Sequence, residues 1–493
     1  MSRSFSPDPR FRFLFPKGVA LVLFILAASF SRAQDPFVSM LGSASGSASP
    51  DPRTQQAHHV DDKNTVEPNV SIPVAPLGFA PPAAFYLGDR FVQVSLDFLD
   101  EDTLLFTFRV PGLIPREPVA PGQPQQDQRH IRAVTLSLPG GKVTGEDLWV
   151  LHDYSRYLWP LKDGKFLLRD RNVLQVGDAD LDLQPFLRFP GPVNFIEFAP
   201  DKALIVADTN ESAAPGPKSE TGEEPGPDRQ AQDRQSQDQQ SLDQESQPTT
   251  ASASTGSNGG FDGDLQKAQR TSKSLVRILR TDTRQVMLFS RVNGAVHLPV
   301  DGDGYYAALR GSGSNWMVSY EYFKGSTIPL GWVESTCNPT LDALSPGIVL
   351  ASACAANGAR HLTAFMRDRD KDHARLWDIS CNPTRIWPLL ESSADGTRLA
   401  RATLEVTHPV DSYNPLDDSD IRGQSVQVFD VANGKVELIA PASPVLDGGG
   451  NFALSPSGRH FAVLNAGAIQ VFDLPPAPQI PPPQAPQPTL AKP

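Results

Sequence analysis

Acidic residues spaced two apart are the first places in this sequence where a cation could bind. Asp368, Asp370 and Asp372 alternate in the way that the first ligands of a calcium-binding loop do. The sixth position of such a loop is His373 here instead of glycine, and the twelfth is Ile379 instead of glutamate. An exposed hairpin turn therefore explains this segment better than a metal site.

Other polar groups fit a turn or a solvated segment in the same way. His58-His59 and Asp61-Asp62 lie in a Ser/Gly/Pro-rich stretch that offers no further ligands, so we interpret them as solvated. The remaining groups have the composition of strand-connecting turns. They are Asp178, Asp180 and Asp182; Asp301-Gly302-Asp303-Gly304; and Ser393-Ala-Asp-Gly-Thr397, which is similar to a sialidase Asp-box without its Gly-x-Thr-Trp spacing.

Motifs for the common hydrolytic chemistries are absent from the sequence. A serine hydrolase of the propeller-capped peptidase type needs a Gly-x-Ser-x-Gly elbow on an α/β domain, and neither is present. The 9 histidines are scattered and the 3 cysteines form no Cys-x-x-Cys pair, which argues against zinc. The sequence therefore predicts no catalytic, cofactor-binding or metal-binding residue and no cofactor.

Cys337, Cys354 and Cys381 permit one disulfide and leave one thiol. If residues 338–344 and 348–354 form a hairpin, Cys337 lies opposite Cys354. Cross-strand pairs approach within disulfide range, so this pairing is our prediction. A Cys337–Cys381 bond, or no bond, remains an alternative.

Short apolar runs separated by turn residues make up most of the chain. Residues 451–474 contain three such runs, broken by Ser-Pro-Ser-Gly and Asn-Ala-Gly, which indicates a three-stranded antiparallel meander. Six four-stranded units precede it, and each has a face that only a neighbouring unit can cover. These units occupy residues 91–153, 156–189, 193–292 with one interruption, 295–334, 337–380 and 381–441.

The units share short echoes at a period of 40 to 45 residues, which is typical of propeller blades. Cys-Asn-Pro-Thr occurs at 337–340 and 381–384, and Val-Phe-Asp at 428–430 and 471–473. With SPSGRHFAVLNAGAIQVFDLP, LWDIS and VQVFDVANGKV, the chain resembles the WD40-like β-propellers, in the degenerate form common among exported bacterial proteins. The family's Gly-His dipeptide and its Asp–His–Ser/Thr–Trp network are missing from most units.

The resemblance implies an all-β fold, a seven-bladed β-propeller of four-stranded antiparallel blades. A spare strand at about 69–80 would pair with 469–474 and close the ring. The tryptophans, including Trp159, Trp316, Trp332, Trp377 and Trp387, are expected to pack in the core or between blades. The expected boundaries are a signal peptide at 1–33, a disordered leader at 34–65, the propeller at 66–475 with a disordered Gln/Asp/Ser-rich insertion at 210–270, and a Pro-rich disordered tail at 476–493.

The N-terminus predicts export. Basic residues precede an apolar run at 18–30, and Ala33 fits a signal-peptidase site before Gln34. That run would span only about 20 Å as a helix, less than a hydrocarbon core of about 30 Å. A cleaved signal and a secreted or periplasmic chain without a transmembrane span are therefore expected; an uncleaved anchor is the alternative.

Net charge and fold together limit the functions that we consider. A net charge of −12 and the lack of a basic cluster in the mature chain argue against nucleic-acid binding. The favoured hypothesis is a monomeric, non-enzymatic scaffold that binds protein, peptide or glycan in the cell envelope. One alternative is an enzyme of lyase, lactonase or dehydrogenase type, which requires titratable side chains or metal ligands from several blades at one channel mouth. Another is a structural envelope component.

Overall fold

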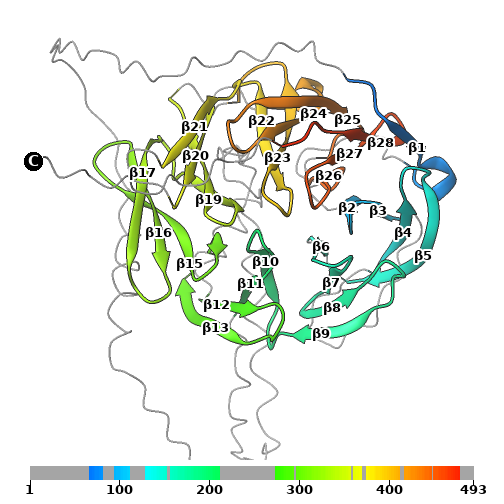
Figure 1. Ribbon diagram of the computed structural model, residues 1–493, viewed down its shortest axis with the longest axis horizontal. Coiled ribbons are helices and arrows are strands. Elements are labelled where there is room, and N and C mark those ends of the chain that lie inside the picture. The colour runs from blue at the N-terminus through cyan, green and yellow to red at the C-terminus, as the bar shows by residue number, and fades with distance from the viewer. Residues whose placement is uncertain are drawn as a thin grey trace, which may run out of the picture.

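The chain forms a ring of seven four-stranded antiparallel sheets, which confirms the predicted seven-bladed propeller (Figure 1). In each blade the first strand lies nearest the middle of the ring and the fourth lies outside, as β2, β6 and β10 against β5, β9 and β13 show. The computed structural model describes residues 66–80, 94–110, 128–152, 156–210, 273–293, 296–356, 359–368, 374–410, 416–446 and 448–477.

The first three blades follow the predicted units closely. Blade 1 consists of β2 (Val94–Phe98), β3 (Thr103–Arg109), β4 (Arg129–Ser137) and β5 (Lys142–Leu151). Blade 2 consists of β6 (Leu158–Pro160), β7 (Phe166–Asp170), β8 (Val173–Gly177) and β9 (Gln184–Arg188). Blade 3 consists of β10 (Val193–Phe198), β11 (Leu204–Asn210), β12 (Lys273–Arg280) and β13 (Val286–Asn293).

The next three blades repeat the same order of strands. Blade 4 consists of β14 (Val300–Asp301), β15 (Gly304–Arg310), β16 (Asn315–Tyr322) and β17 (Thr327–Glu334). Blade 5 consists of β18 (Thr340–Ser345), β19 (Ile348–Cys354), β20 (Arg360–Met366) and β21 (Arg375–Ser380). Blade 6 consists of β22 (Arg385–Ser392), β23 (Arg398–Val406), β24 (Ile421–Asp430) and β25 (Val436–Ala442), with the short helix η3 (Asp418–Asp420) before β24.

Blade 7 is completed by the two ends of the ordered chain. It contains β26 (Phe452–Leu454), β27 (His460–Asn465), β28 (Ala468–Asp473) and, on its outer edge, β1 (Val70–Pro73). The register pairs Val70 with Val471 and Ile72 with Ile469, which confirms closure by an N-terminal strand. The strand is shorter than predicted, because the 3-10 helix η1 (Ala75–Leu77) follows it directly.

Blade 3 joins the parts of the chain on either side of the predicted insertion. β11 and β12 pair from Leu204 opposite Arg280 to Asn210 opposite Ser274. Asn210 thus ends a strand, and residues 211–272 lie outside the described residues, as do the predicted signal, the leader and most of the tail. The two parts of the propeller share one sheet and therefore one ring.

The apolar core is divided into seven clusters, and each lies between two neighbouring blades. Trp149, Trp159 and Trp377 belong to three of these clusters, as expected for tryptophans packed between blades. Trp332 contradicts that expectation, because its side chain on the outer strand β17 is 49% exposed. Alternate residues of an outermost strand point away from the ring, so a strand pattern alone does not bury them.

One hairpin in blade 1 departs from the apolar pattern of the sequence. Apolar residues recur over 133–143 and again over 147–153, but the hairpin between β4 and β5 turns at 138–141, Leu-Pro-Gly-Gly. Gly141 has a φ of +64°, and a Cβ there would come within 2.8 Å of Ile72. The turn residues therefore end β4 earlier than the apolar pattern suggested.

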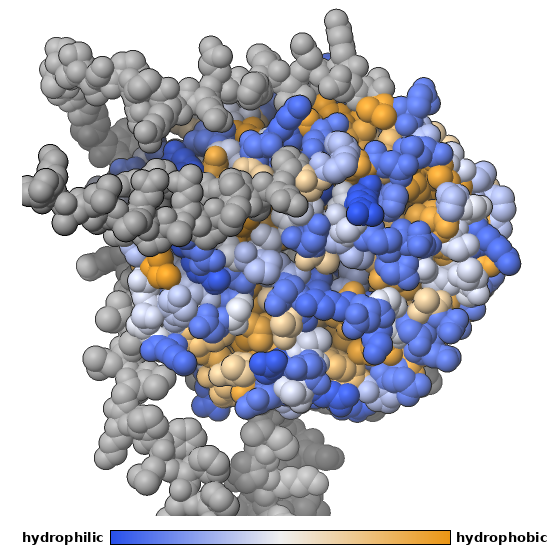
Figure 2. All heavy atoms as spheres, viewed as in Figure 1, coloured by the Kyte–Doolittle hydropathy of each residue, from blue (hydrophilic) through white to orange (hydrophobic). Residues whose placement is uncertain are grey.

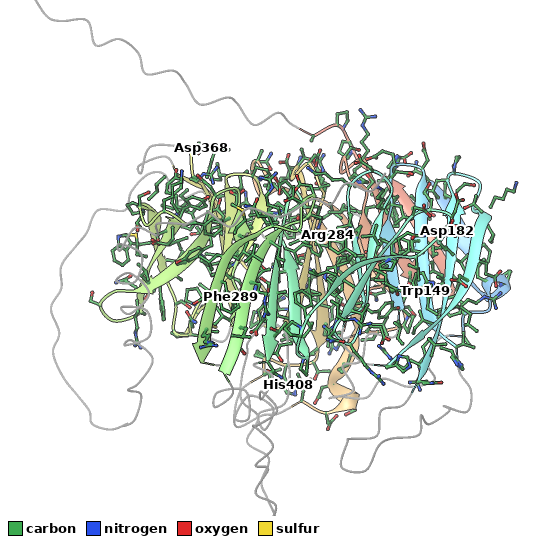
Figure 3. The ribbon with its side chains drawn as sticks, turned by 90° about the horizontal axis from the view of Figure 1, so that it is seen from below. Trp149, Asp182, Arg284, Phe289, Asp368 and His408 are labelled. Atoms are coloured by element: carbon green, nitrogen blue, oxygen red, sulfur yellow. A yellow bond between two sulfur atoms is a disulfide. The ribbon has the colours of Figure 1, made fainter. Side chains whose placement is uncertain are left out.

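The ring has two faces with different connections. The hairpin face carries the turns between first and second strands and between third and fourth strands, including those with Asp182 and Asp368. The loop face carries the connections between second and third strands and between blades, and His408 lies there (Figure 3). In the described part of the chain, no helix is sufficiently long and apolar to cross a membrane.

Candidate functional site

Four charged side chains from four blades meet near the axis of the ring. We call them the axial cluster: Asp97 on β2, Arg156 just before β6, Lys202 in the turn after β10 and Glu391 on β22. Asp97 and Lys202 both influence the pKa of Glu391, and Asp97 and Glu391 both influence the pKa of Lys202. Because blades 3 and 6 are far apart around the ring, only its middle can bring Lys202 and Glu391 together.

The two acids of the cluster are held in surroundings that disfavour their charged form. Asp97 is 3% exposed, and the Ser95 hydroxyl donates a hydrogen bond of 2.5 Å to it. Burial raises the pKa of Asp97, and Arg156 offsets part of this effect. Burial, and then the charge of Asp97, raise the pKa of Glu391 to about 8. Glu391 is therefore mostly protonated at neutral pH.

The two basic side chains of the cluster make cation–π contacts with aromatic rings. The Arg156 guanidinium lies 5.6 Å from the centroid of Trp159, and its Nε donates to the Leu158 carbonyl at 3.1 Å. The Lys202 ammonium lies 5.7 Å from the centroid of Phe198. Burial, and then Arg156, lower the pKa of Lys202. These cation–π contacts stabilise the bases without neutralising the acids.

The four members of the axial cluster do not form ion pairs with one another. In the part of the chain that the structure describes, no salt bridge joins two of its four members. Glu391 accepts only a long hydrogen bond of 3.4 Å from the Leu454 amide. Lys202 and Glu391 also keep partial contact with solvent, and Arg156 is exposed. A polar ligand would therefore meet ionisable groups that lack close partners.

A second group of titratable residues joins blades 3, 4 and 5. The imidazole of His297, just before β14, bonds the Glu197 carboxylate on β10 through Nδ1 and donates from Nε2 to the Leu341 carbonyl at 2.7 Å. Burial opposes the imidazolium, but the hydrogen bond and charge of Glu197 outweigh burial and raise the pKa of His297 to about 9. Burial raises the pKa of nearby Asp342 to about 6. His297 and Glu197 are paired with each other, so we assign them to blade-to-blade contact, whereas the buried Oδ2 of Asp342 has no hydrogen-bond partner.

The acidic turns identified in the sequence lie on the hairpin face, where Arg367 joins two of them by pairing with Asp301 and with Asp368, each at 3.2 Å. Asp178 accepts hydrogen bonds from the amides of Asp180 and Asp182 at 3.1 and 3.3 Å and so stabilises its own turn. Asp395 accepts from the Ser393 hydroxyl at 2.7 Å in the same way. Among the described residues, no three His, Cys, Asp or Glu side chains form a group that could hold a metal ion. Of the three acids for which we predicted an exposed hairpin turn, Asp370 and Asp372 lie outside the described residues.

Asp301 has a larger role than its Asp-Gly-Asp-Gly sequence suggested. Its side chain is buried, and its Oδ2 accepts hydrogen bonds from the Tyr306 hydroxyl at 2.8 Å, the Gly347 amide at 2.8 Å and Arg367 at 3.2 Å. Arg367 also lies 4.5 Å from the centroid of the Tyr320 ring. Gly347 and Arg367 belong to blade 5, so Asp301 holds two blades together.

The cysteines lie away from the axial cluster, on the loop face. Cys337 and Cys354 form a disulfide with a Cα–Cα distance of 5.6 Å, and Cys381 is buried outside it. Arg360 donates to Cys354 Sγ at 3.3 Å. The disulfide links the ends of the two innermost strands of blade 5, which is a structural arrangement.

Sequence reasoning missed the axial cluster altogether. Asp97 sits in the apolar run Val-Ser-Leu-Asp-Phe, and Lys202 follows Pro-Asp in a turn, so neither stands out. The one local signal is a charged residue near the end of the first strand of a blade, as at Asp97, Glu197 and Glu391. Only a blade alignment that marks these positions would have revealed it.

Apolar side chains also reach the surface on three outer strands. They are Val143, Leu148 and Val150 on β5; Val286, Met287 and Phe289 on β13; and Trp332 on β17. Figure 2 shows the surface from the direction of Figure 1, where hydrophilic residues cover most of the coloured area and hydrophobic residues form smaller patches. These rim residues are spread over separate blades, so they form no common site with the axis.

Comparison with known proteins gives no activity for this chain. No family model and no curated protein matches the sequence. Similar solved structures include Pyrococcus horikoshii acylaminoacyl peptidase, at 9% identity and a TM-score of 0.41, over 78% of this chain and 53% of that chain. The β-propeller domain of the Trilobed protease from Pyrococcus furiosus has 8% identity and a TM-score of 0.37, over 78% of this chain and 93% of that one. The Neurospora crassa Pan2 WD40 domain has 9% identity and a TM-score of 0.37, over 79% of this chain and 90% of that domain. The chain spans about half the length of the peptidase.

Proposed function

We propose that this protein is a non-enzymatic, exported propeller that binds a peptide, protein or glycan ligand at the axis of its ring. The observation that carries the proposal is the axial cluster, whose charged groups come from four blades and have no ion-pair partners among themselves. Asp97 is buried and Lys202 and Glu391 are partly buried, and burying a charged group without a partner costs stability. A rigid ring that holds them in that state is prepared for a polar ligand.

Export is part of the same proposal. The basic N-terminus, the apolar run at 18–30 and Ala33 support a cleaved signal peptide. The disulfide of Cys337 with Cys354 suits an oxidising compartment. We further propose that the mature protein is a monomer in the periplasm or outside the cell. N-terminal sequencing of the exported protein should begin near Gln34, and a mature protein that retains residues 18–30 would contradict cleavage.

The binding function is tested with the full chain against arrays of tripeptides and of short glycans. The axial double variant Asp97→Asn with Glu391→Gln is compared with Glu334→Gln, a matched change on the outer strand β17. We expect at least one class of probe to bind the unaltered protein and Glu334→Gln. The axial variant should bind it at least 10-fold more weakly, as expected from the loss of charged hydrogen bonds.

Two outcomes would contradict the binding proposal. One is that no probe of either class binds the unaltered protein. The other is that binding survives in the axial variant, which would move the site elsewhere, for example to the exposed rim of β13. A purely structural envelope role agrees with the first outcome.

An enzyme is the second candidate, because four titratable groups do converge on the axis. Glu391, with a pKa raised to about 8, is suited to act as a general acid, and Lys202, with a lowered pKa, as a base. This pair favours proton-transfer chemistry of the lyase type over the other enzymatic alternatives. Mass spectrometry of bound probes over time separates the two candidates. Conversion that is lost in Glu391→Gln would favour the enzyme, and unchanged probes favour the scaffold.

A further inference from the structure

We propose that the axial cluster binds a small zwitterion, with the ligand's ammonium group between Asp97 and Glu391 and its carboxylate against Arg156 and Lys202. This inference rests on the proposed function, because it names the chemistry that the axis recognises. The shared chemistry is that of an amino acid or of a short peptide with free ends. The argument depends on the order of the charges around the ring, on their missing partners and on the burial of Asp97.

The charges of the cluster are separated into two arcs. Glu391 on blade 6 and Asp97 on blade 1 lie on either side of blade 7. Arg156 and Lys202 belong to blades 2 and 3, which are neighbours. Acids therefore occupy one part of the ring's middle and bases the next part. A ligand with one positive and one negative end matches this order.

Ligands with a single charge match the cluster poorly. An isolated anion bound by Arg156 and Lys202 would also face Asp97, which is electrostatically coupled to both bases. An isolated cation bound by Asp97 and Glu391 would face the two bases. Like charges brought together in poorly solvated surroundings are strongly disfavoured. A zwitterion satisfies both arcs at once.

Each arc also lacks the partners that a ligand would supply. Asp97 accepts one neutral hydroxyl, and Glu391 accepts one amide at 3.4 Å. An ammonium group donates three hydrogen bonds and would serve both carboxylates. The bases lie against Trp159 and Phe198, and Arg156 Nε donates to the Leu158 carbonyl; the Lys202 ammonium and the terminal N–H groups of Arg156 could donate to a carboxylate.

Binding should be coupled to the loss of a proton. Glu391 is mostly protonated at pH 6.5, because its pKa is raised to about 8. An ammonium group beside it favours the ionised carboxylate. The ligand should therefore displace a proton from Glu391, and calorimetry in two buffers of different protonation enthalpy detects this release.

Isothermal titration at pH 6.5 tests the inference with the full chain. The probes are glycine, β-alanine, 4-aminobutyrate and 6-aminohexanoate as free zwitterions, and diglycine and triglycine as peptides. Ethylammonium and acetate are the single-charge controls. We expect one zwitterion to bind at least 10-fold more tightly than either control, and the better of the two series identifies an amino acid or a peptide as the source.

Variants give a readout that a merely structural role would not. Glu391→Gln imitates the protonated side chain and should fold; it should weaken binding about 10-fold and abolish proton release. Lys202→Met should weaken binding similarly while proton release persists. Glu334→Gln, on the outer strand, should change neither. A Glu391→Gln protein that binds and releases protons as the unaltered protein does would overturn the assignment.

The failure of this inference differs from the failure of the proposed function. If no zwitterion binds, or if acetate or ethylammonium binds as tightly as the best zwitterion, the zwitterion assignment is wrong. The binding function survives that result if the glycan array, or tripeptides that are blocked at both ends, still give a ligand that the axial double variant loses. If the arrays also give nothing, both proposals fail.

Discussion

Removing the Asp301 carboxylate should destabilise the ring more than any other change on the hairpin face that we consider. Asp301 is 3% exposed, and one oxygen atom accepts three hydrogen bonds, from Tyr306, Gly347 and Arg367. Asp301→Ala leaves all three donors without their acceptor. An unsatisfied buried donor costs about 1–3 kcal/mol, and a broken buried ion pair about 3–5 kcal/mol. Because the three contacts share one atom and are not additive, we expect a loss of about 3–5 kcal/mol.

Two milder variants separate the charge from the hydrogen bonds. Asp301→Asn can keep its amide oxygen where all three donors point, so it loses the charge alone, and we expect about 1–2 kcal/mol. Tyr306→Phe removes one donor and should cost about 1 kcal/mol. Asp303→Asn is the matched control in the same turn, because Asp303 accepts only the Tyr320 hydroxyl at 3.1 Å. Its cost should stay below about 1 kcal/mol.

Urea denaturation followed by tryptophan fluorescence measures these changes in the free energy of unfolding. Equal slopes with denaturant among the variants show that the same unfolding transition is compared. The reasoning is refuted if Asp301→Ala costs no more than Asp303→Asn. That result would mean that water replaces the carboxylate and that blades 4 and 5 do not depend on this contact.

Three further predictions follow from other contacts. Replacing Cys337 and Cys354 by serine should lower the free energy of unfolding by about 2–4 kcal/mol in urea denaturation, because the bond closes a loop with a sequence separation of 17. Folding raises the pKa of His297 from 6.5 to about 9, so its contribution to stability is complete below pH 6.5 and is lost as pH rises through 9. His297→Gln should therefore flatten the fall in melting temperature between pH 6.5 and 9, and an unchanged pH profile would argue against the Glu197 contact. Cleavage within 211–272 should leave two fragments that elute together in size-exclusion chromatography, because β11 and β12 are paired; separate elution would contradict the shared blade.

Strands and turns were predictable because the signals that define them are local. A turn such as Ser-Pro-Ser-Gly before β27 must interrupt an apolar run wherever it occurs. A four-stranded sheet with two apolar faces needs a neighbouring sheet on each side. The units that recur every 40 to 45 residues supply these neighbours and make up a ring of seven sheets. Closure of the ring was predictable from the number of strands, because the last unit had three strands and one unassigned strand lay near residue 70.

The functional features were not predictable, because they depend on residues that only the ring brings together. Asp301 reads as a turn residue, and its partner Gly347 lies 46 positions later in the next blade. Asp97 and Glu391 are almost 300 residues apart, and neither has a local partner that signals an unusual pKa. Trp332 fits a strand pattern as well as Trp377 does, yet the outer position of β17 exposes it. The position of each residue in the ring determines which residues it contacts and whether it is exposed, and a single sequence does not give that position.

The closing blade links the fold to the axial cluster. Blade 7 lies between the two acids, and its Leu454 amide reaches Glu391. On its other side the Ser457 amide and hydroxyl each donate to Glu101 of blade 1 at 2.7 Å, beside the strand that carries Asp97. The pairing of β1 with β28 and this contact both hold blade 7 against blade 1. Since the acids approach each other only across blade 7, the strand that closes the ring also fixes the spacing of the groups that we propose to bind the ligand's ammonium.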